Sequence, residues 1–515
     1  MEKESSMESG STAKENEKPS KKPGKTLYDY QKEDLSRIFK AISEESDDFN
    51  LLYQLPTGGG KTVIFSEIAR KYINEKQKKV VILTHRIELL RQTSKMLAEF
   101  KVKNKVIDSE IKSLPDQDEY QCFVAMVETL NNRLNEEAIK FEEVGLVIID
   151  EAHYNSFRKL FKFFKDCFIL GVTATPLSSN VNKPMNDIYG KLLVGHPIKS
   201  LVDMGFLAQA TTYTYHVGLG TLKIGANGDY TVRSSDMLYS TEGMQSKLLQ
   251  AYSERAKGKK TLIFNNGIKT SKRVYLNFAA AGYDIKHVDS KTPKKERKAI
   301  LKWFHETPEA ILTSVGILTT GFDEPTVEVV ILNRATRSPT LYYQMIGRGS
   351  RITETKDRFD IMDLGNNVAR FGLWSDELDW QRIFKNPRKY LETLISDDEI
   401  ERRFVYTMPD DIREQFSKTE VIDFNVKEEY EKATKQGERP QIVLERSMDQ
   451  HIKMCIENSD TLEEAYELVR LLEEDVIDRV RHYCYCISNS TKNYKNWLLE
   501  EYNKKLRSQL AMEFL

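Results

Sequence analysis

The sequence predicts an α/β protein with two parallel-sheet domains in tandem, followed by a mainly helical C-terminal region. Short Val/Ile-rich runs alternate with helical patterns from Tyr28 to about Leu201. That alternation is typical of a parallel sheet with crossover helices. It resumes between Lys260 and Leu332 and thins out after about Gly372. A chain of 515 residues has room for about two to four domains.

The first 25 residues form a tail rich in Lys, Glu and Ser, with Thr12 as the only β-branched residue and no aromatic one. Such a composition cannot bury enough apolar surface to fold, so residues 1–25 are predicted to be disordered. The stretch Lys18–Lys25 also fits a weak localisation signal, although a solvated tail is the simpler interpretation.

A glycine-rich loop follows the tail and the first helical segment. Without side chains, its three glycines let successive N–H groups turn toward an anion. Lys61 would then reach the phosphates of a nucleoside triphosphate, Thr62 would place its hydroxyl on Mg²⁺, and the helix that follows adds positive dipole. Leu55 stands where the usual pattern has glycine. The predicted phosphate-binding residues are consecutive: Thr57, Gly58, Gly59, Gly60, Lys61 and Thr62.

A second hydrophobic run, Leu146–Ile149, ends in the carboxylates Asp150 and Glu151. At the end of a buried strand, Asp150 can hold Mg²⁺ and Glu151 can polarise an attacking water, which are two needs of phosphoryl transfer. A solvated strand end is the plain alternative.

The second domain is expected to contain strands near residues 260–264, 285–288, 310–313 and 327–332. Before them, Gly218–Val232 carries Asn227-Gly228 between Thr, Ile, Tyr and Val residues, which is a hairpin signal. Two interpretations are open: a surface β-ribbon, which is the commoner case, or a pin that separates strands.

The C-terminal region is charged and helical in pattern, with long segments at Leu462–Val480 and Trp497–Leu510. Residues 421–515 hold 14 basic and 19 acidic residues, which suits contacts with a protein partner better than a nucleic-acid clamp. A nuclease site near Pro409-Asp410 lacks a Glu-x-Lys partner and is disfavoured.

Composition excludes several classes. The net charge of −1 gives no global support for nucleic-acid binding, so any basic groove must be local. The five cysteines form no CxxC pair, so we expect no zinc and a reducing, intracellular environment. A metal site at His482, Cys484 and Cys486 is disfavoured because the segment has a helical pattern. No run approaches 18 apolar residues, so we expect a soluble, cytoplasmic protein without membrane contact.

Several motifs occur together and in order, and the chain thereby resembles a superfamily 2 helicase. The match covers roughly residues 27–351. Its segments are Leu27–Gln31 (Q motif), the glycine loop (motif I), Thr84–Leu89 (Ia), Val127–Leu130 (Ib), Asp150–His153 (a DEAH box), Thr173–Pro176 (III), Thr319–Asp323 (V) and Gln344–Arg351 (VI). Val288–Pro293 and Asp363–Val368 are most similar to the RadD-like and type III restriction-helicase-like branch, although the zinc-type cysteine cluster usual in RadD proteins is missing.

The resemblance implies two tandem RecA-like domains and further residues around ATP. Gln31 would form hydrogen bonds with the adenine. Tyr28 would stack on the adenine, at a position where relatives often have Arg; the alternative is that its ring packs in the core. Gly321 and Asp323 would approach the ribose and γ-phosphate side. Motif VI would supply arginine fingers, spaced so as to share one helical face, and His153 would couple the nucleotide site to motif VI. These implied catalytic residues are His153, Gln344, Arg348 and Arg351.

The resemblance also implies contacts with the nucleic-acid backbone. Short hydroxyls and an arginine at strand ends suit phosphate contacts, which position a strand without reading its sequence. The candidates are Thr84, Arg86, Thr129, Thr319 and Thr320, and each threonine could instead cap a helix. Thr173 and Thr175 would relay domain closure.

Together these observations predict an ATP- and Mg²⁺-dependent helicase or translocase acting on nucleic acid, with DNA favoured over RNA. The alternative is a nucleic-acid-stimulated ATPase that serves as a switch or subunit without unwinding. The expected parts are a tail (1–25), a first RecA-like domain (26–205), a second (206–372) and a helical accessory region (373–515).

Overall fold

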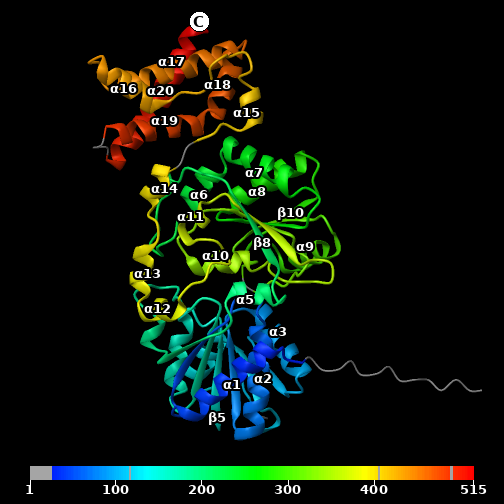
Figure 1. Ribbon diagram of the computed structural model, residues 1–515. Coiled ribbons are helices and arrows are strands. Elements are labelled where there is room, and N and C mark those ends of the chain that lie inside the picture. Colours follow the sequence, from blue (N-terminus) through cyan, green and yellow to red (C-terminus); the bar gives the residue numbers. More distant parts are fainter. Residues whose placement is uncertain (1–25, 115–116, 320, 404–405, 488–490, 515) are drawn as a thin grey trace, which may run out of the picture.

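The computed structural model describes residues 26–114, 117–319, 321–403, 406–487 and 491–514. Its parts are stacked in three tiers, with one α/β domain below a second and a helical bundle above both (Figure 1). The predicted fold class is therefore confirmed. The tail that the sequence predicts to be disordered lies outside the described residues.

The first domain is built on a seven-stranded parallel sheet in the order β3-β4-β2-β5-β6-β1-β7. Its strands contain the Val/Ile runs predicted from the sequence, and the central ones are buried on both faces, as a sheet covered on both sides requires. The bounds are β1 Asn50–Gln54, β2 Lys79–Thr84, β3 Asn104–Ile107, β4 Cys122–Met126, β5 Val144–Asp150, β6 Phe168–Thr173 and β7 Lys191–Val194.

Helices cover both faces of this sheet. One face packs against α1 (Asp29–Glu44), α2 (Lys61–Lys76) and α3 (Ile87–Glu99). The other packs against α4 (Val127–Asn135) and the 3-10 helices η2 (Asn155–Phe163) and η3 (Met185–Asp187). A short 3-10 turn, η1 (Gln117–Glu119), lies before β4, and α5 (Ile198–Asp203) leads to the second domain.

The second domain holds a six-stranded parallel sheet in the order β10-β11-β9-β12-β13-β8. Its strands are β8 Gln209–Thr214, β9 Thr261–Asn265, β10 Ile285–Val288, β11 Ile311–Val315, β12 Val329–Asn333 and β13 Arg358–Asp363. The helices on its two faces are α6 Val232–Tyr239, α7 Glu242–Arg255, α8 Ile268–Ala280, α9 Lys294–Glu306, α10 Pro339–Ile346 and α11 Asn367–Phe371.

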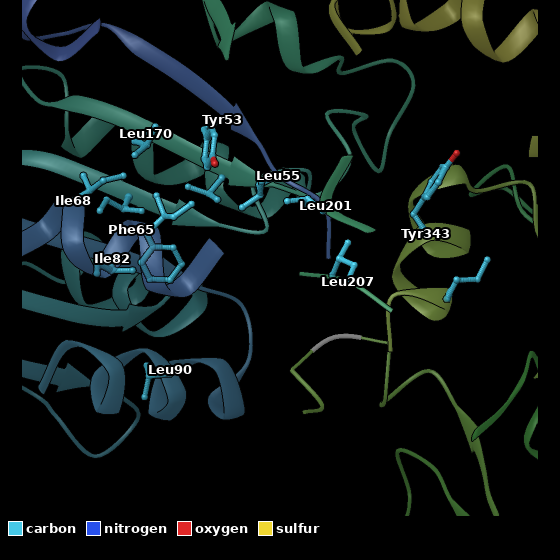
Figure 2. Packing of buried hydrophobic residues seen from close by; sticks show 14 of the residues in the cluster. Tyr53, Leu55, Phe65, Ile68, Ile82, Leu90, Leu170, Leu201, Leu207 and Tyr343 are labelled. Atoms are coloured by element: carbon cyan, nitrogen blue, oxygen red, sulfur yellow. The ribbon is translucent and has the colours of Figure 1, made fainter. Parts of the chain in front are cut away.

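The hydrophobic core runs continuously from the first domain into the second. Figure 2 shows Leu201 and Leu207 between the first sheet and helix α10, which carries Tyr343. Leu201 and Leu207 are fully buried, and they belong to the same cluster as Tyr53 and Phe65 of the first domain. The two domains are therefore packed against each other, which places their facing loops in contact.

The predicted hairpin at Gly218–Val232 is much smaller than a ribbon. Its only antiparallel pairing among the described residues is an isolated bridge between Ile224 and Tyr230. The turn docks onto the second domain because Asp229 accepts hydrogen bonds from the Thr336 hydroxyl at 2.8 Å and the Arg337 backbone N–H at 2.7 Å. Two backbone hydrogen bonds, from Thr231 to Lys223 and from Gly225 to Asp229, and this side-chain docking together fix the segment.

After the second sheet the chain forms a strap, residues 374–397, which runs beside both domains (Figure 1). Trp374 packs edge-on against Phe359 of β13, with ring centroids 5.5 Å apart. Phe384 is buried in the hydrophobic cluster of the first domain. Asp397 returns to the second domain, where it accepts from Arg370 at 2.6 Å. The strap's helices are α12 Trp380–Lys385 and α13 Pro387–Thr393.

The C-terminal bundle has a core of its own and adjoins the second domain. Its predicted helix Leu462–Val480 is interrupted at Leu472 and forms two helices. His482 pairs with Asp478, and the described part of the chain contains no group of three or more His, Cys, Asp or Glu residues placed to hold a metal ion. No helix among the described residues is long and apolar enough to cross a membrane. The remaining helices are α14 Asp397–Arg403, α15 Asp410–Glu414, α16 Val426–Lys435, α17 Ile442–Glu457, α18 Leu462–Leu471, α19 Glu473–Cys486 and α20 Lys492–Glu513.

Candidate ATP site at the domain interface

The glycine loop joins β1 to the N-terminus of α2, as the sequence predicts. Gly58 and Gly60 have φ values of +88° and +84°, which favour glycine. A Cβ atom on Gly60 would lie 2.4 Å from the side-chain nitrogen of Gln31, and one on Gly59 would lie 2.8 Å from Leu55. Leu55 is fully buried beneath the loop. This packing explains why a leucine stands where the usual pattern has glycine.

Lys61 is turned back onto its own loop. Its ammonium lies 3.3 Å from the carbonyl oxygen of Leu55 and 3.5 Å from that of Pro56. Burial lowers the pKa of Lys61, while the charges of Glu151 and Asp150 oppose that shift. Thr62, the predicted Mg²⁺ ligand, is the second residue of α2 and so lies at the same helix N-terminus. An anion in the loop would therefore meet an ammonium group and free helix N–H groups together.

The Q motif packs directly against this loop. The Tyr30 hydroxyl donates to the carbonyl of Gly59 at 2.8 Å, and Gln31 is almost fully buried beside Gly60. Tyr28, by contrast, is 55% exposed, and its ring lies 4.6 Å from that of Phe206. The sequence-based alternative of a packed core ring for Tyr28 is thus not what the structure shows, and an aromatic face is accessible next to Gln31.

The two carboxylates differ in their charge environments. Asp150 ends β5, where burial, and then the Glu151 charge, raise its pKa to about 7. Burial also acts to raise the pKa of Glu151, but Lys61 and nearby histidines outweigh it, so this pKa is lowered. Glu151 has a φ of +53°, an uncommon conformation for a non-glycine residue. The carboxyl group of Glu151 is therefore ionised at neutral pH. The carboxyl group of Asp150 is partly protonated there, and a bound cation would displace its proton.

The second domain brings its arginines to the same cleft. Arg348 donates to the carbonyl of Phe322 at 2.6 Å, and its buried Nε has no hydrogen-bond partner. Arg351 forms an ion pair with Asp323. Burial lowers the pKa of both guanidinium groups to about 10, so both remain charged at neutral pH. Gly321, with a φ of +74°, lies in the same loop as Asp323.

Two hydrogen-bonded links cross the cleft. The side-chain nitrogen of Gln344 lies 3.4 Å from Nε2 of His153, and Nδ1 of His153 lies 3.1 Å from the Thr173 hydroxyl. The Thr175 hydroxyl donates to that of Thr340 at 3.0 Å. Burial lowers the pKa of His153, so its imidazole is neutral and can accept from the Gln344 amide. The acidic strand end is therefore connected to α10, which ends at Ile346. Arg348 and Arg351 lie in the turn and loop after this helix, so the prediction that they share one helical face is wrong.

The predicted nucleic-acid residues lie in varied surroundings. Thr84 is fully buried and donates to the Arg86 carbonyl at 3.3 Å. Arg86 donates to the carbonyl of Ile317 in the second domain at 3.0 Å. Thr319 donates to Gly316 at 3.0 Å. Thr129 lies within α4 and is half-buried, and Thr320 lies outside the described residues. The structure brings Arg86 and the motif V loop together and leaves Thr129 on α4.

Sequence reasoning missed several residues that complete the interface. A Cβ on Gly58 would lie 2.7 Å from Leu207 and 2.9 Å from the Ser350 hydroxyl. A Cβ on Gly347 would lie 2.5 Å from Thr57. Phe206 and Thr340 were missed as well. Common residue types at these positions carry no signal, because only the approach of the two domains makes them neighbours.

The residues present fit a nucleotide and its metal ion. Buried polar atoms without a hydrogen-bond partner include the Thr57 hydroxyl, one oxygen of Glu151 and Nε of Arg348. Buried polar groups are normally paired, and each of these three atoms could pair with a group of a bound nucleotide or its water. Three glycines leave no room for side chains, and two carboxylates, a hydroxyl and a lysine converge on the loop. These groups have the chemistry that a Mg²⁺–triphosphate requires.

Comparison with known proteins gives the same assignment. Residues 24–178 match the family described as "Type III restriction enzyme, res subunit", and residues 244–353 match "Helicase conserved C-terminal domain". A 51.5 kDa protein of a Lactococcus phage (isolate 7-9) is 30% identical over 65% of this chain and 70% of its own length. The chain belongs to the superfamily 2 helicases, within the restriction-helicase-related branch.

Other relatives are longer than this chain. The IRC3 protein of Saccharomyces cerevisiae, a candidate ATP-dependent helicase, is 29% identical over 65% of this chain but only 51% of its own length. Two solved structures share the fold. A fragment assigned to an HsdR subunit of a type I restriction enzyme from Vibrio vulnificus YJ016 has a TM-score of 0.51, with 22% identity over 70% of this chain and 65% of the fragment. The ATP-dependent Type ISP restriction-modification enzyme LlaBIII bound to DNA has a TM-score of 0.50, with 14% identity over 96% of this chain and 43% of that one.

Proposed function

We propose that this helicase-family protein hydrolyses ATP as a DEAH-box enzyme and uses the resulting opening and closing of its domains to move along, or unwind, DNA. The observation that carries the proposal is the interface itself. The phosphate loop and Glu151 come from one domain, Arg348 and Arg351 come from the other, and His153 and Gln344 link the two. Domain bounds of 26–205, 206–372 and 373–515 are supported by the strands that each of the first two spans contains.

Each residue of the site has a role that its environment suits. Lys61 and the loop N–H groups would hold the β- and γ-phosphates, and Thr62 and Asp150 would hold Mg²⁺, which neutralises phosphate charge when bound. Glu151, kept ionised by its neighbours, would orient the attacking water and accept its proton. Arg348 and Arg351 would leave the Phe322 carbonyl and Asp323 to meet the γ-phosphate.

Domain movement would reach the nucleic acid through the same contacts. Arg86 follows β2 of the first domain and already donates to the Gly316–Ile317 backbone of the second. Closure would therefore shift the motif V loop and Arg86 together, and the Thr175–Thr340 hydrogen bond would transmit the position of α10. Gripping the strand in one state and releasing it in the other would convert hydrolysis into a step.

DNA is favoured because one of the two matching families is named for a restriction enzyme, and both structures described above come from restriction enzymes, one of them solved bound to DNA. An intracellular site of action accords with five cysteines that remain without disulfides. Repair, replication or defence would suit such an activity. A protein partner is proposed for the C-terminal bundle, which resembles none of the motor motifs.

The second candidate is a nucleic-acid-stimulated ATPase that acts as a switch. It is favoured by the strap, which is buried against the first domain at Phe384 and tied to the second at Asp397. A chain that holds both domains together restricts how far the cleft can open. Such a protein would signal its nucleotide state to a partner rather than take long steps.

The deciding experiment measures ATP hydrolysis by the full chain with single-stranded DNA, duplex DNA, branched DNA and RNA in turn, followed by strand displacement. We expect stimulation to be strongest with DNA and displacement to require ATP. Lys61→Ala should abolish turnover and serves as the control. Stimulated hydrolysis without displacement or translocation would favour the switch, and hydrolysis unaffected by any nucleic acid would contradict both candidates.

A further inference from the structure

The strap encloses space as well as tying the two domains together. A cavity of about 640 Å³ lies between the two motor domains and helix α13. Its walls come from the loop 177–184 of the first domain, the turn 227–229, the start of α10, and strap residues 387–396. That volume lies within the range of about 300–1,000 Å³ typical of sites that take a small-molecule-sized group.

The walls of the cavity consist of an apolar part and a polar part. One part is apolar and includes Leu177, Val181 and Leu391. Val181 is 47% exposed, so this surface can be reached from outside. Arginines and hydroxyl groups make up the polar part, among them Arg337, Arg388, Ser178 and Thr340. An apolar wall beside cations and hydroxyls matches the alternation of base or sugar with phosphate along a nucleic-acid strand.

The local charge favours an anion. Arg388 is exposed on α13, and within the described part of the chain its guanidinium has no recorded ion pair or hydrogen bond. Arg337 is 37% exposed and shares the carboxylate of Asp397 with Arg370. Of the other acidic residues here, Asp229 forms an ion pair with Arg334 at 3.4 Å. Only Glu392 of the lining opposes the free arginine.

The cavity lies on the same sheet face of the first domain as Thr129, whereas Arg86 and the motif V loop lie at α3 on the other face. Loop 177–184 leads into η3, and Met185 of η3 belongs to the same hydrophobic cluster as Leu130 of α4 and Phe384 of the strap. Helix α4 carries Thr129, a predicted backbone contact. Thr340, which bonds to Thr175 across the cleft, is part of the cavity wall. A strand in the cavity would therefore touch one of the links between the domains.

We infer that this cavity is a subsite for single-stranded nucleic acid, in which the strand passes beneath the strap with Arg388 and Arg337 on its phosphates. The inference rests on the proposed function. It adds residues outside the helicase motifs, and it assigns the strap the role of closing over the strand. Because the contacts are to backbone and apolar surface, binding here is independent of sequence.

The test compares Arg388→Ala with Arg382→Ala in the full chain. Both residues are exposed on the strap, both changes remove one positive charge, and only Arg388 lines the cavity. Affinity for fluorescent oligo-dT and oligo-U of equal length is measured over a salt series. Arg388→Ala should weaken binding about fivefold at low salt and reduce the slope of log K against log salt by about 0.7. Arg382→Ala should change neither.

A second readout is direct. Oligonucleotides carrying 4-thiothymidine should cross-link to peptides containing residues 177–184 or 387–396. If the wild type binds oligonucleotide but Arg388→Ala behaves as Arg382→Ala and cross-links fall elsewhere, the subsite is wrong while the proposed function stands. If the wild type binds neither DNA nor RNA, the proposed function itself fails. Equal melting temperatures of the two variants exclude a folding defect.

Discussion

Gly347 offers a way to block domain closure without harming either domain. It ends α10 with φ −57° and ψ −10°, an ordinary right-handed conformation that alanine adopts freely. A Cβ atom there would lie 2.5 Å from Cβ of Thr57 and 2.6 Å from its Cγ2, across the interface. The methyl group of Gly347→Ala therefore clashes with the phosphate loop of the other domain.

The size of the effect follows from the geometry. Carbon atoms pack at about 3.5–4.0 Å, so relieving the contact moves the loop that carries Arg348 and Arg351 by about 1 Å. A misplacement of about 1 Å costs a catalytic site about 100-fold in rate, which is about 2.7 kcal/mol of barrier. The compatible backbone contributes about 0.4–1 kcal/mol of stability through the unfolded chain, but the clash opposes that gain, so we expect no net stabilisation of the fold.

The assay combines three measurements on Gly347→Ala: kcat for stimulated ATP hydrolysis, melting temperature, and binding of a fluorescent ATP analogue. We expect kcat to fall about 100-fold, with the melting temperature unchanged or slightly lowered and with nucleotide binding retained by the first domain. Adding Thr57→Gly to Gly347→Ala removes the clashing atoms. The double variant should therefore lose less activity relative to Thr57→Gly alone than Gly347→Ala loses relative to the wild type. Hydrolysis at the wild-type rate would refute the reasoning.

Three further changes test the site. Glu151→Gln should stop hydrolysis while tightening nucleic-acid binding in ATP; weaker binding, measured by anisotropy, would count against Glu151 as the water activator. Asp150→Asn should raise the melting temperature of the nucleotide-free protein more at pH 8 than at pH 5. The raised pKa of about 7 means that Asp150 keeps a proton in the folded protein that it loses in the unfolded chain. The stability that this proton contributes is full below about pH 4 and is lost as pH rises through 7. A change in melting temperature that is independent of pH would contradict this. Thr175→Val and Thr340→Val should each slow stimulated hydrolysis about fivefold and the double variant no further, as one hydrogen bond of about 1 kcal/mol predicts; additive losses would show that the two hydroxyls act separately.

The fold class and the family could be predicted from the order of the motifs along the chain. The glycine loop, the acidic pair after Leu146–Ile149 and the motif VI arginines are local patterns whose backbone needs are specific. The glycine loop and the acidic pair lie where expected, at β1–α2 and the end of β5, whereas both arginines follow α10 and do not share a helical face. The sequence could not explain why Leu55 replaces the usual glycine, because the cause is the packing of the Leu55 side chain beneath Gly59.

The predicted hairpin shows the limit of local signals. Asn227-Gly228 does mark a turn, but the pairing around it is limited to the bridge between Ile224 and Tyr230 and the backbone hydrogen bonds beside it, and the Asp229 side chain binds Thr336. Likewise, Leu472 divides a helix that periodicity alone continues. In both cases a tertiary contact or packing angle overrides a pattern that the sequence supports locally.

By itself the sequence determined two parallel-sheet domains, a nucleotide loop, and membership of the superfamily 2 helicases. Only the tertiary structure decided which residues of one domain meet the other. Gly347 against Thr57, Gln344 against His153, and the strap's Phe384 against the first sheet join positions far apart in the chain. No residue pattern encodes such pairs, because they depend on how two separately folded surfaces fit together. The phosphate loop becomes half of a site only through that fit.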